Sequence, residues 1–136
     1  MPFALGYIPV GPRVKKILFM AEPDEVTGEL LPHWGNQLSS PDAGASILQA
    51  VPNMLELVPR GVNKWVGAKV LLQALGVPRQ AFMAVGDGGN DLELVANAGV
   101  GVAMGNAVAA VRSAATWVAS SHDEDGIAEA FEKYVL

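Results

Sequence analysis

These 136 residues contain no cysteine, which excludes disulfide bonds and thiolate metal sites within them. Basic residues are scarce: nine Lys and Arg stand against fourteen Asp and Glu, a net charge of −5 that argues against a nucleic-acid-binding surface. No apolar run approaches the roughly 18 residues of a membrane-spanning helix, and the proline-interrupted start is not typical of a secretory signal peptide. Hydrophobic residues reach 51% against 17% charged, so the sequence predicts a folded domain with a substantial core.

The first sixty residues divide into an irregular start and a small segment of strands. Residues 1–13 are rich in Pro and Gly and show no periodicity. In residues 14–60, short apolar runs are typical of strands. The polar stretch at residues 21–46 predicts only a helical turn or two, at Val26–Leu31. The predicted strands are Val14–Met20, Ile47–Val51 and Met54–Val58, the last two on either side of a turn at Pro52-Asn53.

From about residue 61 the pattern changes to alternating helices and strands. Trp65, Ala68, Leu72 and Leu75 share one face of a helix, and Gly76 follows where such a helix ends. The run QAFMAVG at 80–86 is continuously apolar, as in a parallel strand buried on both faces. The other predicted elements are helices at 91–98, 106–115 and 126–134 and strands at 100–104 and 116–119. This order predicts an α/β domain with a parallel sheet over residues 61–136.

A glycine-rich loop with two carboxylates follows the apolar strand. Ligands of open α/β sheets bind beyond the carboxyl ends of the strands, where Asp87 would lie, with Asn90 as the predicted N-cap of the next helix and Asp91 behind it. Two carboxylates at one point suit Mg²⁺, a hard cation that takes oxygen ligands. Gly88 and Gly89 leave room for a phosphate at the helix N-terminus. The alternative is a turn in which Asp and Asn serve only as caps, since these residues dominate turns.

Lys64 is the second candidate for a functional residue. It opens the helix that precedes the strand carrying Asp87, so both side chains can reach the same end of the sheet. A lysine at a helix start opposes the helix dipole. This small cost makes a functional role for Lys64 more plausible, and a solvated surface lysine remains the alternative.

Three motifs in a fixed order carry a family resemblance. They are PRGVNK at 59–64, AVGDGGND at 84–91 and GVAMGNA at 101–107. Together they resemble the haloacid dehalogenase superfamily, and within it the Cof-type, sugar-phosphatase-like branch. The resemblance implies a Rossmann-like α/β/α core with a parallel sheet, of which residues 61–136 would form the C-terminal half. It also implies that residues 14–60 are part of an α/β cap domain, which in this branch selects the substrate.

The resemblance implies roles for individual residues. Lys64 would neutralise the charge of the phosphoryl group and of the nucleophile, and Asn90 would contact the substrate phosphate. Asp87 would ligate Mg²⁺, the implied cofactor, and Asp91 would support the metal site and the lysine. Lys64 and Asp87 are thus the predicted catalytic residues, Lys64 and Asn90 the predicted phosphate-binding residues, and Asp87 and Asp91 the predicted metal ligands.

The family's nucleophile is the first Asp of a D-x-D-x-T motif, and no such motif precedes Lys64. Covalent phosphoryl transfer needs this carboxylate, because Mg²⁺ and a lysine only stabilise charge. We expect a Mg²⁺-dependent phosphomonoester hydrolase for a sugar or another small phosphorylated metabolite, with this chain inactive by itself. The alternative is a non-catalytic unit that binds metal or phosphate and acts through another chain. A dinucleotide-binding unit is disfavoured because no G-x-G-x-x-G opens a helix after the first strand.

The strand that carries Asp87 also predicts a partner. In the fold of the resembled family, its far side pairs with the nucleophile-bearing strand, which these residues do not include. Phe82–Val85 would then be an unpaired apolar edge with no Lys or Pro to protect it, which is a template for pairing with another strand. We expect either self-association through this edge or its occupation by residues 1–13.

Overall fold

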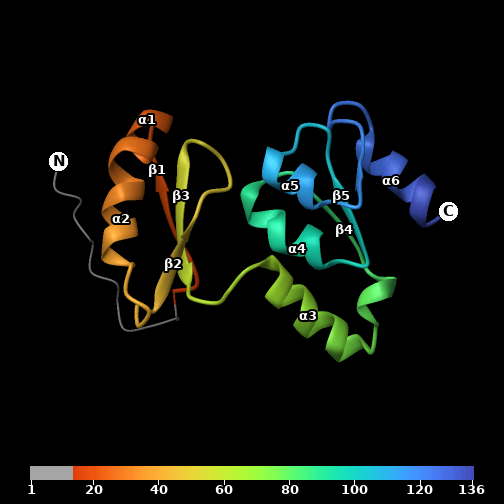
Figure 1. Ribbon diagram of the computed structural model, residues 1–136, viewed down its shortest axis with the longest axis horizontal. Coiled ribbons are helices and arrows are strands. Elements are labelled where there is room, and N and C mark those ends of the chain that lie inside the picture. Colours follow the sequence, from red (N-terminus) through yellow and green to blue (C-terminus); the bar gives the residue numbers. More distant parts are fainter. Residues whose placement is uncertain (1–13) are drawn as a thin grey trace.

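Two three-stranded sheets, each with its own helices, make up the part of the chain that the computed structural model describes, residues 14–136. Figure 1 shows them side by side, the first in orange to yellow and the second in green to blue. We call residues 14–60 the N-terminal unit and residues 64–136 the C-terminal unit. Gly61, at a φ of 76°, turns the chain between them.

The N-terminal unit is an antiparallel sheet in the order β1-β3-β2. Its strands are β1 (Ile17–Met20), β2 (Ala45–Leu48) and β3 (Met54–Pro59). Leu55 and Leu57 of β3 face the helices of this unit and are buried there. Glu56 points to the other face, where its buried carboxylate accepts a hydrogen bond from Lys16 Nζ at 2.7 Å. This pairing satisfies a charge in the central strand that would otherwise be costly to bury.

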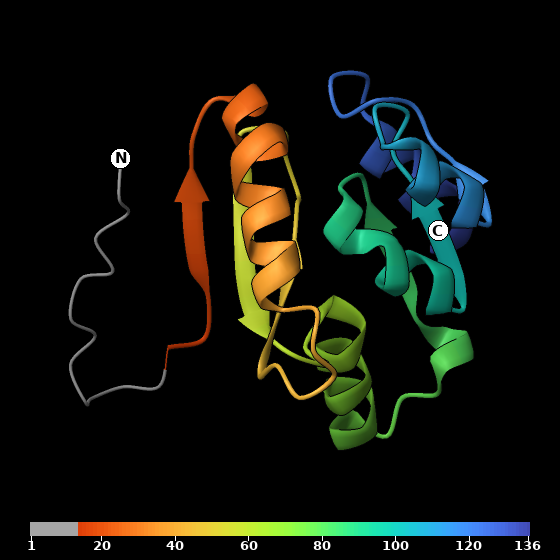
Figure 2. The ribbon, with the colours of Figure 1, turned by 60° about the vertical axis from the view of Figure 1, so that its left-hand side comes forward.

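The polar stretch after β1 is helical from Pro23 to Gln37, so the prediction of one or two turns at Val26–Leu31 was too short. The segment consists of α1 (Pro23–Glu25), the π-helical turn η1 (Val26–Leu30) and α2 (Leu31–Gln37). Val26, Leu30 and Trp34 recur every four residues and form an apolar stripe against the sheet. The turned view of Figure 2 shows this helical run lying across one face of the sheet, with β1 at its edge. Burial of the stripe outweighs the proline and glycine residues that argue against a helix.

The C-terminal unit is a parallel sheet in the order β4-β5-β6 with helices on both faces. Its strands are β4 (Met83–Gly86), β5 (Val100–Ala103) and β6 (Trp117–Val118), and its helices are α3 (Lys64–Leu75), α4 (Leu92–Asn97), α5 (Ala109–Ala114) and α6 (Gly126–Tyr134). Neighbouring residues of β5 pack on opposite faces of the sheet. Ala103 packs with Val95 of α4 and Val111 of α5. Val102 packs with Ala130 of α6. The mixed α/β fold with a parallel sheet is as predicted.

Two boundaries near the candidate loop differ from the prediction. The strand predicted at 80–86 begins only at Met83, because Arg79–Ala81 form the 3₁₀ turn η2. The helix predicted to start at Asn106 begins at Ala109. Asn106 therefore does not cap that helix, and its side chain is free for other contacts.

Strand β4 lies at the edge of the sheet as far as residues 14–136 show, with β5 on one side. The carbonyl groups of Phe82 and Gly86 accept hydrogen bonds from the β5 side. By alternation, the backbone groups of Met83 and Val85 point to the open side. The predicted alternative occupant, residues 1–13, lies outside the described residues. No helix in the described part is both long and apolar enough to cross a membrane.

Candidate active site

The loop after β4 closes on the side chain of Asp91. Strand β4 ends at Gly86, and the 3₁₀ turn η3 (Gly89–Asp91) leads into α4. Asp91 Oδ2 accepts hydrogen bonds from the backbone N–H groups of Asp87 and Gly88, each at 3.1 Å. Asp91 is buried, with 5% of its surface exposed. The loop is thus a closed set of hydrogen bonds at the carboxyl end of β4, where ligands of α/β sheets bind.

Gly86 is required for this closure. A β-carbon at Gly86 would lie 2.5 Å from the β-carbon of Asp91 and 2.9 Å from its carboxyl carbon. Real β-carbons do not approach other atoms so closely, and both of these atoms are near the Asp91 backbone. Any side chain at position 86 would therefore displace the Asp91 carboxylate from the loop.

Lys64 reaches the same loop from the first turn of α3. Asn63 caps this helix, because its side chain accepts a hydrogen bond from the Val66 N–H at 2.9 Å. This places Lys64 at the first helical position, where its ammonium group donates to Asp91 Oδ1. The Lys64 side chain is 49% exposed and the Asp91 side chain 7%. The structure therefore brings these two predicted residues into direct contact and leaves half of the lysine open to solvent.

The Asp91 carboxyl group keeps its charge despite its burial. Burial by itself raises the pKa of Asp91, because the charged form is less well solvated. The Lys64 ammonium and the N–H groups of Gly88 and Asp87 act in the opposite direction and prevail, so the pKa of Asp91 lies below the usual 3.8. Lys64 and Asp91 therefore form a charged pair at neutral pH.

Asp87 is held at the surface, with its side chain exposed. Its backbone carbonyl accepts a hydrogen bond from the Val108 N–H at 2.9 Å, and its Oδ2 accepts one from Asn106 Nδ2 at 3.1 Å. Within residues 14–136, no hydrogen bond reaches its other oxygen, Oδ1. Sequence reasoning missed Asn106 as part of the site. The available signal was its position just beyond the carboxyl end of β5, the strand next to β4.

Asn90 lies within η3 and is half-buried. Its Oδ1 lies 2.8 Å from the place that a β-carbon on Gly88 would take, so the side chain folds back over the loop. The N-cap of α4 is Asp91, not Asn90 as predicted, because η3 intervenes between the strand and the helix. The contact of Asn90 with a substrate phosphate stays a prediction.

The hydrogen bonds of the loop carboxylates determine which of their oxygens could bind the predicted Mg²⁺. Residues 14–136 hold no group of three or more His, Cys, Asp or Glu that could enclose a metal ion. Both oxygens of Asp91 accept hydrogen bonds, whereas Asp87 presents one open oxygen to solvent. Mg²⁺ usually keeps several waters and binds through one or two carboxylates together with phosphate oxygens. The donor set fits such an ion through Asp87, with Asp91 placed to support the site through Lys64.

The connection between β2 and β3 lies against the loop. A β-carbon on Gly89 would lie 3.1 Å from the Gln49 carbonyl oxygen, and one on Gly88 would lie 3.4 Å from the Ala50 carbonyl oxygen. A cavity of about 300 Å³ opens beside this contact. Its lining residues are all uncharged: Thr27, Gln49, Ala50, Val51, Pro52, Gly89 and Val108. The N-terminal unit thus borders the candidate site with a neutral surface.

The sequence is similar to known hydrolases over most of its length. Residues 13–131 match the family model of haloacid dehalogenase-like hydrolases. The chloroplastic endoribonuclease YBEY of Arabidopsis thaliana is 36% identical over 123 residues, which are 90% of this chain and 20% of that protein. The 5-amino-6-(5-phospho-D-ribitylamino)uracil phosphatase YitU of Bacillus subtilis is 40% identical over 82 residues, 60% of this chain and 30% of that protein.

A solved structure of a member of this family is also similar to this chain. A haloacid dehalogenase-like hydrolase from Bacteroides thetaiotaomicron aligns with a TM-score of 0.74 at 37% identity, covering 92% of this chain and 46% of that chain. This chain therefore spans less than half the length of each of these three proteins.

Proposed function

The chain belongs to the haloacid dehalogenase-like hydrolases of the Cof type, and on this premise we propose that Lys64 and the loop after β4 form the metal- and phosphate-binding part of a phosphomonoesterase. The relatives include phosphatases, which supports this chemistry at the level of the family. The proposed substrate is a sugar phosphate or another small phosphorylated metabolite.

The observation that carries the proposal is the Lys64–Asp91 pair next to the exposed Asp87. The half-exposed Lys64 side chain offers an ammonium group to phosphate oxygens, and the open oxygen of Asp87 offers a ligand for a cation. Both lie at the carboxyl end of one parallel strand. In this proposal Lys64 neutralises the charge of the phosphoryl group. Asn90, which lies with Asp91 in the turn η3, donates a hydrogen bond from its side-chain amide to a phosphate oxygen.

Mg²⁺ would be held by Asp87, with water and phosphate oxygens completing its coordination. When bound, the ion would neutralise charge on the phosphoryl oxygens. Asp91 would support the ion and the phosphate indirectly, because its oxygens already accept hydrogen bonds from Lys64 and the loop N–H groups. Its role in this proposal is to hold Lys64 by a hydrogen bond, so that the lysine lies beside Asp87 where the phosphate would bind.

The phosphoryl acceptor of the proposed reaction lies outside these residues, because no D-x-D-x-T occurs anywhere in the sequence. We therefore propose that the chain alone binds metal and phosphate without turning over a substrate. The same observation, together with the open edge of β4, favours a second candidate function. In it, the chain is a non-catalytic metal- or phosphate-binding unit that acts by association with another chain.

Residues 14–60 are proposed to be part of a substrate-selecting cap. The support is their position: the connection between β2 and β3 touches Gly88 and Gly89 and borders the cavity of about 300 Å³. A cavity of this size suits a small metabolite. Its uncharged lining favours a leaving group that is polar but neutral, such as a sugar.

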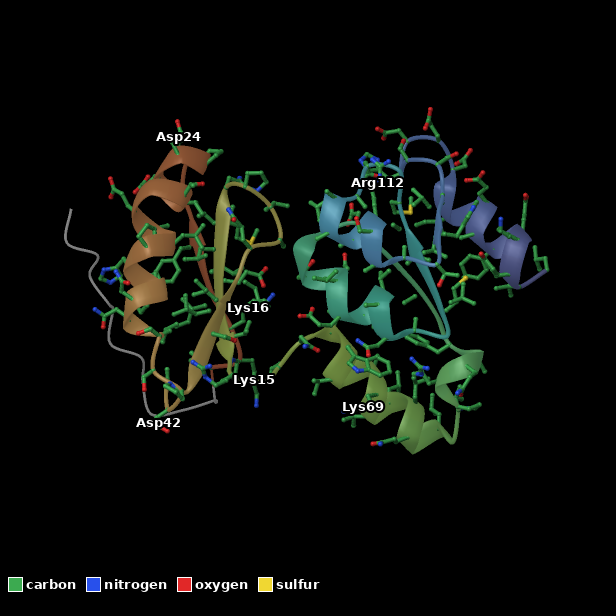
Figure 3. All side chains as sticks on the ribbon, in the orientation of Figure 1. Lys15, Lys16, Asp24, Asp42, Lys69 and Arg112 are labelled. Atoms are coloured by element: carbon green, nitrogen blue, oxygen red, sulfur yellow. The ribbon has the colours of Figure 1, made fainter. Side chains whose placement is uncertain are left out.

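Titration of the 136-residue chain with Mg²⁺, followed by NMR at the amides of residues 87–91, tests the proposal. We expect shifts confined to this loop and a dissociation constant in the millimolar range, because a single carboxylate holds the ion. Asp87→Ala should abolish the shifts. Asp42→Ala, which removes an exposed carboxylate at the far end of the N-terminal unit (Figure 3), should leave them unchanged. Unshifted loop amides in the wild type, or equal shifts in Asp87→Ala, would contradict the proposal.

A further inference from the structure

Asn106 connects Asp87 to the loop that follows β6. Its Nδ2 donates to Asp87 Oδ2 at 3.1 Å, and its Oδ1 accepts a hydrogen bond from the backbone N–H of His122 at 3.1 Å. Two residues further on, the Val108 N–H donates to the Asp87 carbonyl oxygen at 2.9 Å. The segment 106–108 thus holds Asp87 by both its main chain and its side chain.

The two partners fix the orientation of the Asn106 amide. A backbone N–H can only donate a hydrogen bond, and an ionised carboxylate can only accept one. The His122 N–H therefore requires the oxygen of Asn106, and Asp87 requires its NH₂ group. The reversed amide would set donor against donor at His122 and acceptor against acceptor at Asp87. One orientation satisfies both contacts, so the amide is fixed at each end.

We infer that Asn106 is a positioning residue, which holds one oxygen of Asp87 so that the other stays directed outward for a divalent cation. This inference rests on the proposed function. Without Asn106 the exposed carboxylate would be free to rotate about its side-chain bonds, and binding a cation would have to restrict that rotation. Hydrogen-bond partners of metal-binding side chains typically contribute 10–100-fold to metal affinity. Because this bond is exposed to solvent, we expect an effect at the lower end, about tenfold.

The neighbouring His122 supplies a matched control. Only its backbone N–H bonds to Asn106, whereas its ring lies 2.9 Å from Asp123, measured from Nδ1 to Oδ1. His122→Ala removes the ring and keeps the N–H. Asn106→Leu removes both polar atoms of the amide at nearly constant size. The two variants therefore separate loss of the Asn106 contact from loss of a polar side chain in the same loop cluster.

The experiment uses Mn²⁺ as the probe, because its unpaired electrons broaden the amide signals of residues near the ion. Titration of the 136-residue chain, read at residues 87–91, gives a dissociation constant. We expect Asn106→Leu to weaken Mn²⁺ binding about tenfold and His122→Ala to leave it unchanged. The thermal midpoint of the metal-free chain is measured in parallel. It should move by no more than a few degrees in either variant, as for an exposed substitution.

The outcomes separate this inference from the proposed function. Equal Mn²⁺ affinity in the wild type and Asn106→Leu would overturn the inference and leave the proposed function in place. No Mn²⁺ effect on the wild type at residues 87–91 would overturn both. Should Asn106→Leu fail to fold, Asn106→Ala carries the same expectation. A large drop in the thermal midpoint of the metal-free chain in both Asn106→Leu and Asn106→Ala would give Asn106 a structural role and overturn the inference.

Discussion

The ammonium group of Lys64 donates a hydrogen bond to the carboxylate of Asp91, although 27 positions separate the two residues in the sequence. The bond joins the first residue of α3 to the last residue of η3. The other oxygen of Asp91 accepts the N–H groups of Asp87 and Gly88. One buried carboxylate therefore fixes both the Lys64 ammonium group and the loop that presents Asp87. The geometry of the site thus depends on the charge of Asp91.

Acid should weaken the fold through Asp91. The pKa of Asp91 in the folded chain lies below the usual 3.8, so the unfolded chain takes up this proton first as the pH falls. The stabilisation is therefore complete above about pH 4 and is lost as the pH falls through the folded-state pKa. Asp91→Asn should lower the free energy of unfolding by about 1–3 kcal/mol at neutral pH.

Urea unfolding of the wild type and Asp91→Asn at neutral and acidic pH measures this dependence. The difference between the two proteins should shrink as the pH falls below the usual carboxyl pKa, because the wild type then loses the same charge. Asp42→Asn is the control for the loss of an exposed carboxylate and should match the wild type throughout. A constant difference between wild type and Asp91→Asn at every pH would count against the charged pair.

A methyl group at Gly86 should disrupt the site, whereas one at Gly67 should stabilise the fold. The β-carbon of Gly86→Ala would lie 2.5 Å from the Asp91 β-carbon. We expect it to displace Asp91 and to cost about 1–3 kcal/mol, as for other overpacked positions. Gly67 lies in α3, and a β-carbon there would meet no atom within 4 Å outside its own helix backbone and chain neighbours. Gly67→Ala should gain about 0.5–1 kcal/mol in the helix.

Thermal unfolding and the NMR signals of residues 87–91 check both glycine substitutions. Gly86→Ala should lower the midpoint and shift the loop amides together, while Gly67→Ala raises the midpoint and leaves the loop amides in place. A Gly86→Ala protein with wild-type stability and an unshifted loop would show that Asp91 does not need the close approach at position 86.

The 136-residue chain should not hydrolyse a chromogenic phosphomonoester at a measurable rate, with or without Mg²⁺. Lys64 and Asp87 can bind and stabilise charge, but no D-x-D-x-T carboxylate is present to accept the phosphoryl group. Release of the chromogenic alcohol over hours at high protein concentration is the measurement. Turnover that disappears in Lys64→Ala or Asp87→Asn would contradict this expectation and require a different acceptor within the chain.

In purified solution, the chain should self-associate through the open edge of β4, unless residues 1–13 of the same chain occupy that edge. The backbone groups of Met83 and Val85 lack a strand partner within residues 14–136, and unpaired groups of this kind are a template for pairing with another strand. The C-terminal unit also exposes apolar side chains, among them Val70 and Leu71 of α3, at 60% and 58% exposure.

Sedimentation over a range of concentrations, with amide exchange at Phe82–Val85, measures this association. We expect oligomers that grow with concentration and exchange at Met83 and Val85 that slows in step. A monomer at every concentration would contradict self-association. If the Met83 and Val85 amides of such a monomer were protected, another segment of the same chain would occupy the edge.

Local signals in the sequence were sufficient to locate the candidate loop. The apolar run before Gly86 marks a buried strand, and the carboxyl end of a parallel strand is where ligands bind. Gly76 carries a standard cap signal, so the end of α3 follows from a short-range rule, whereas the N-cap role of Asn63 is first shown by the structure. These features depend on residues within a few positions of one another, which is why they are readable without the fold.

Contacts between distant segments were not readable. The support that Asp91 gives to Lys64 was implied only by the family resemblance. The residues alone did not predict that both oxygens of Asp91 would accept hydrogen bonds, from Lys64 and from the loop N–H groups, because the loop closes over Gly86. The metal-ligand role of Asp91 stays a prediction. Asn106 has the form of a helix cap, but the parallel pairing of β4 with β5 brings it to Asp87 instead. In both cases the nearest polar partner is set by the tertiary arrangement.

The most direct test of the proposed function is whether phosphate binding depends on Mg²⁺ and on Lys64 together. Inorganic phosphate is titrated into the chain with and without Mg²⁺, for the wild type, Lys64→Ala and Lys69→Ala. Lys69 is the control because it is an exposed lysine on the same helix (Figure 3). We predict that Mg²⁺ tightens phosphate binding to the wild type and Lys69→Ala, and that Lys64→Ala binds phosphate about tenfold more weakly, as for loss of a charged hydrogen bond. Equal phosphate affinity in Lys64→Ala and Lys69→Ala, unaffected by Mg²⁺, would contradict the proposed function.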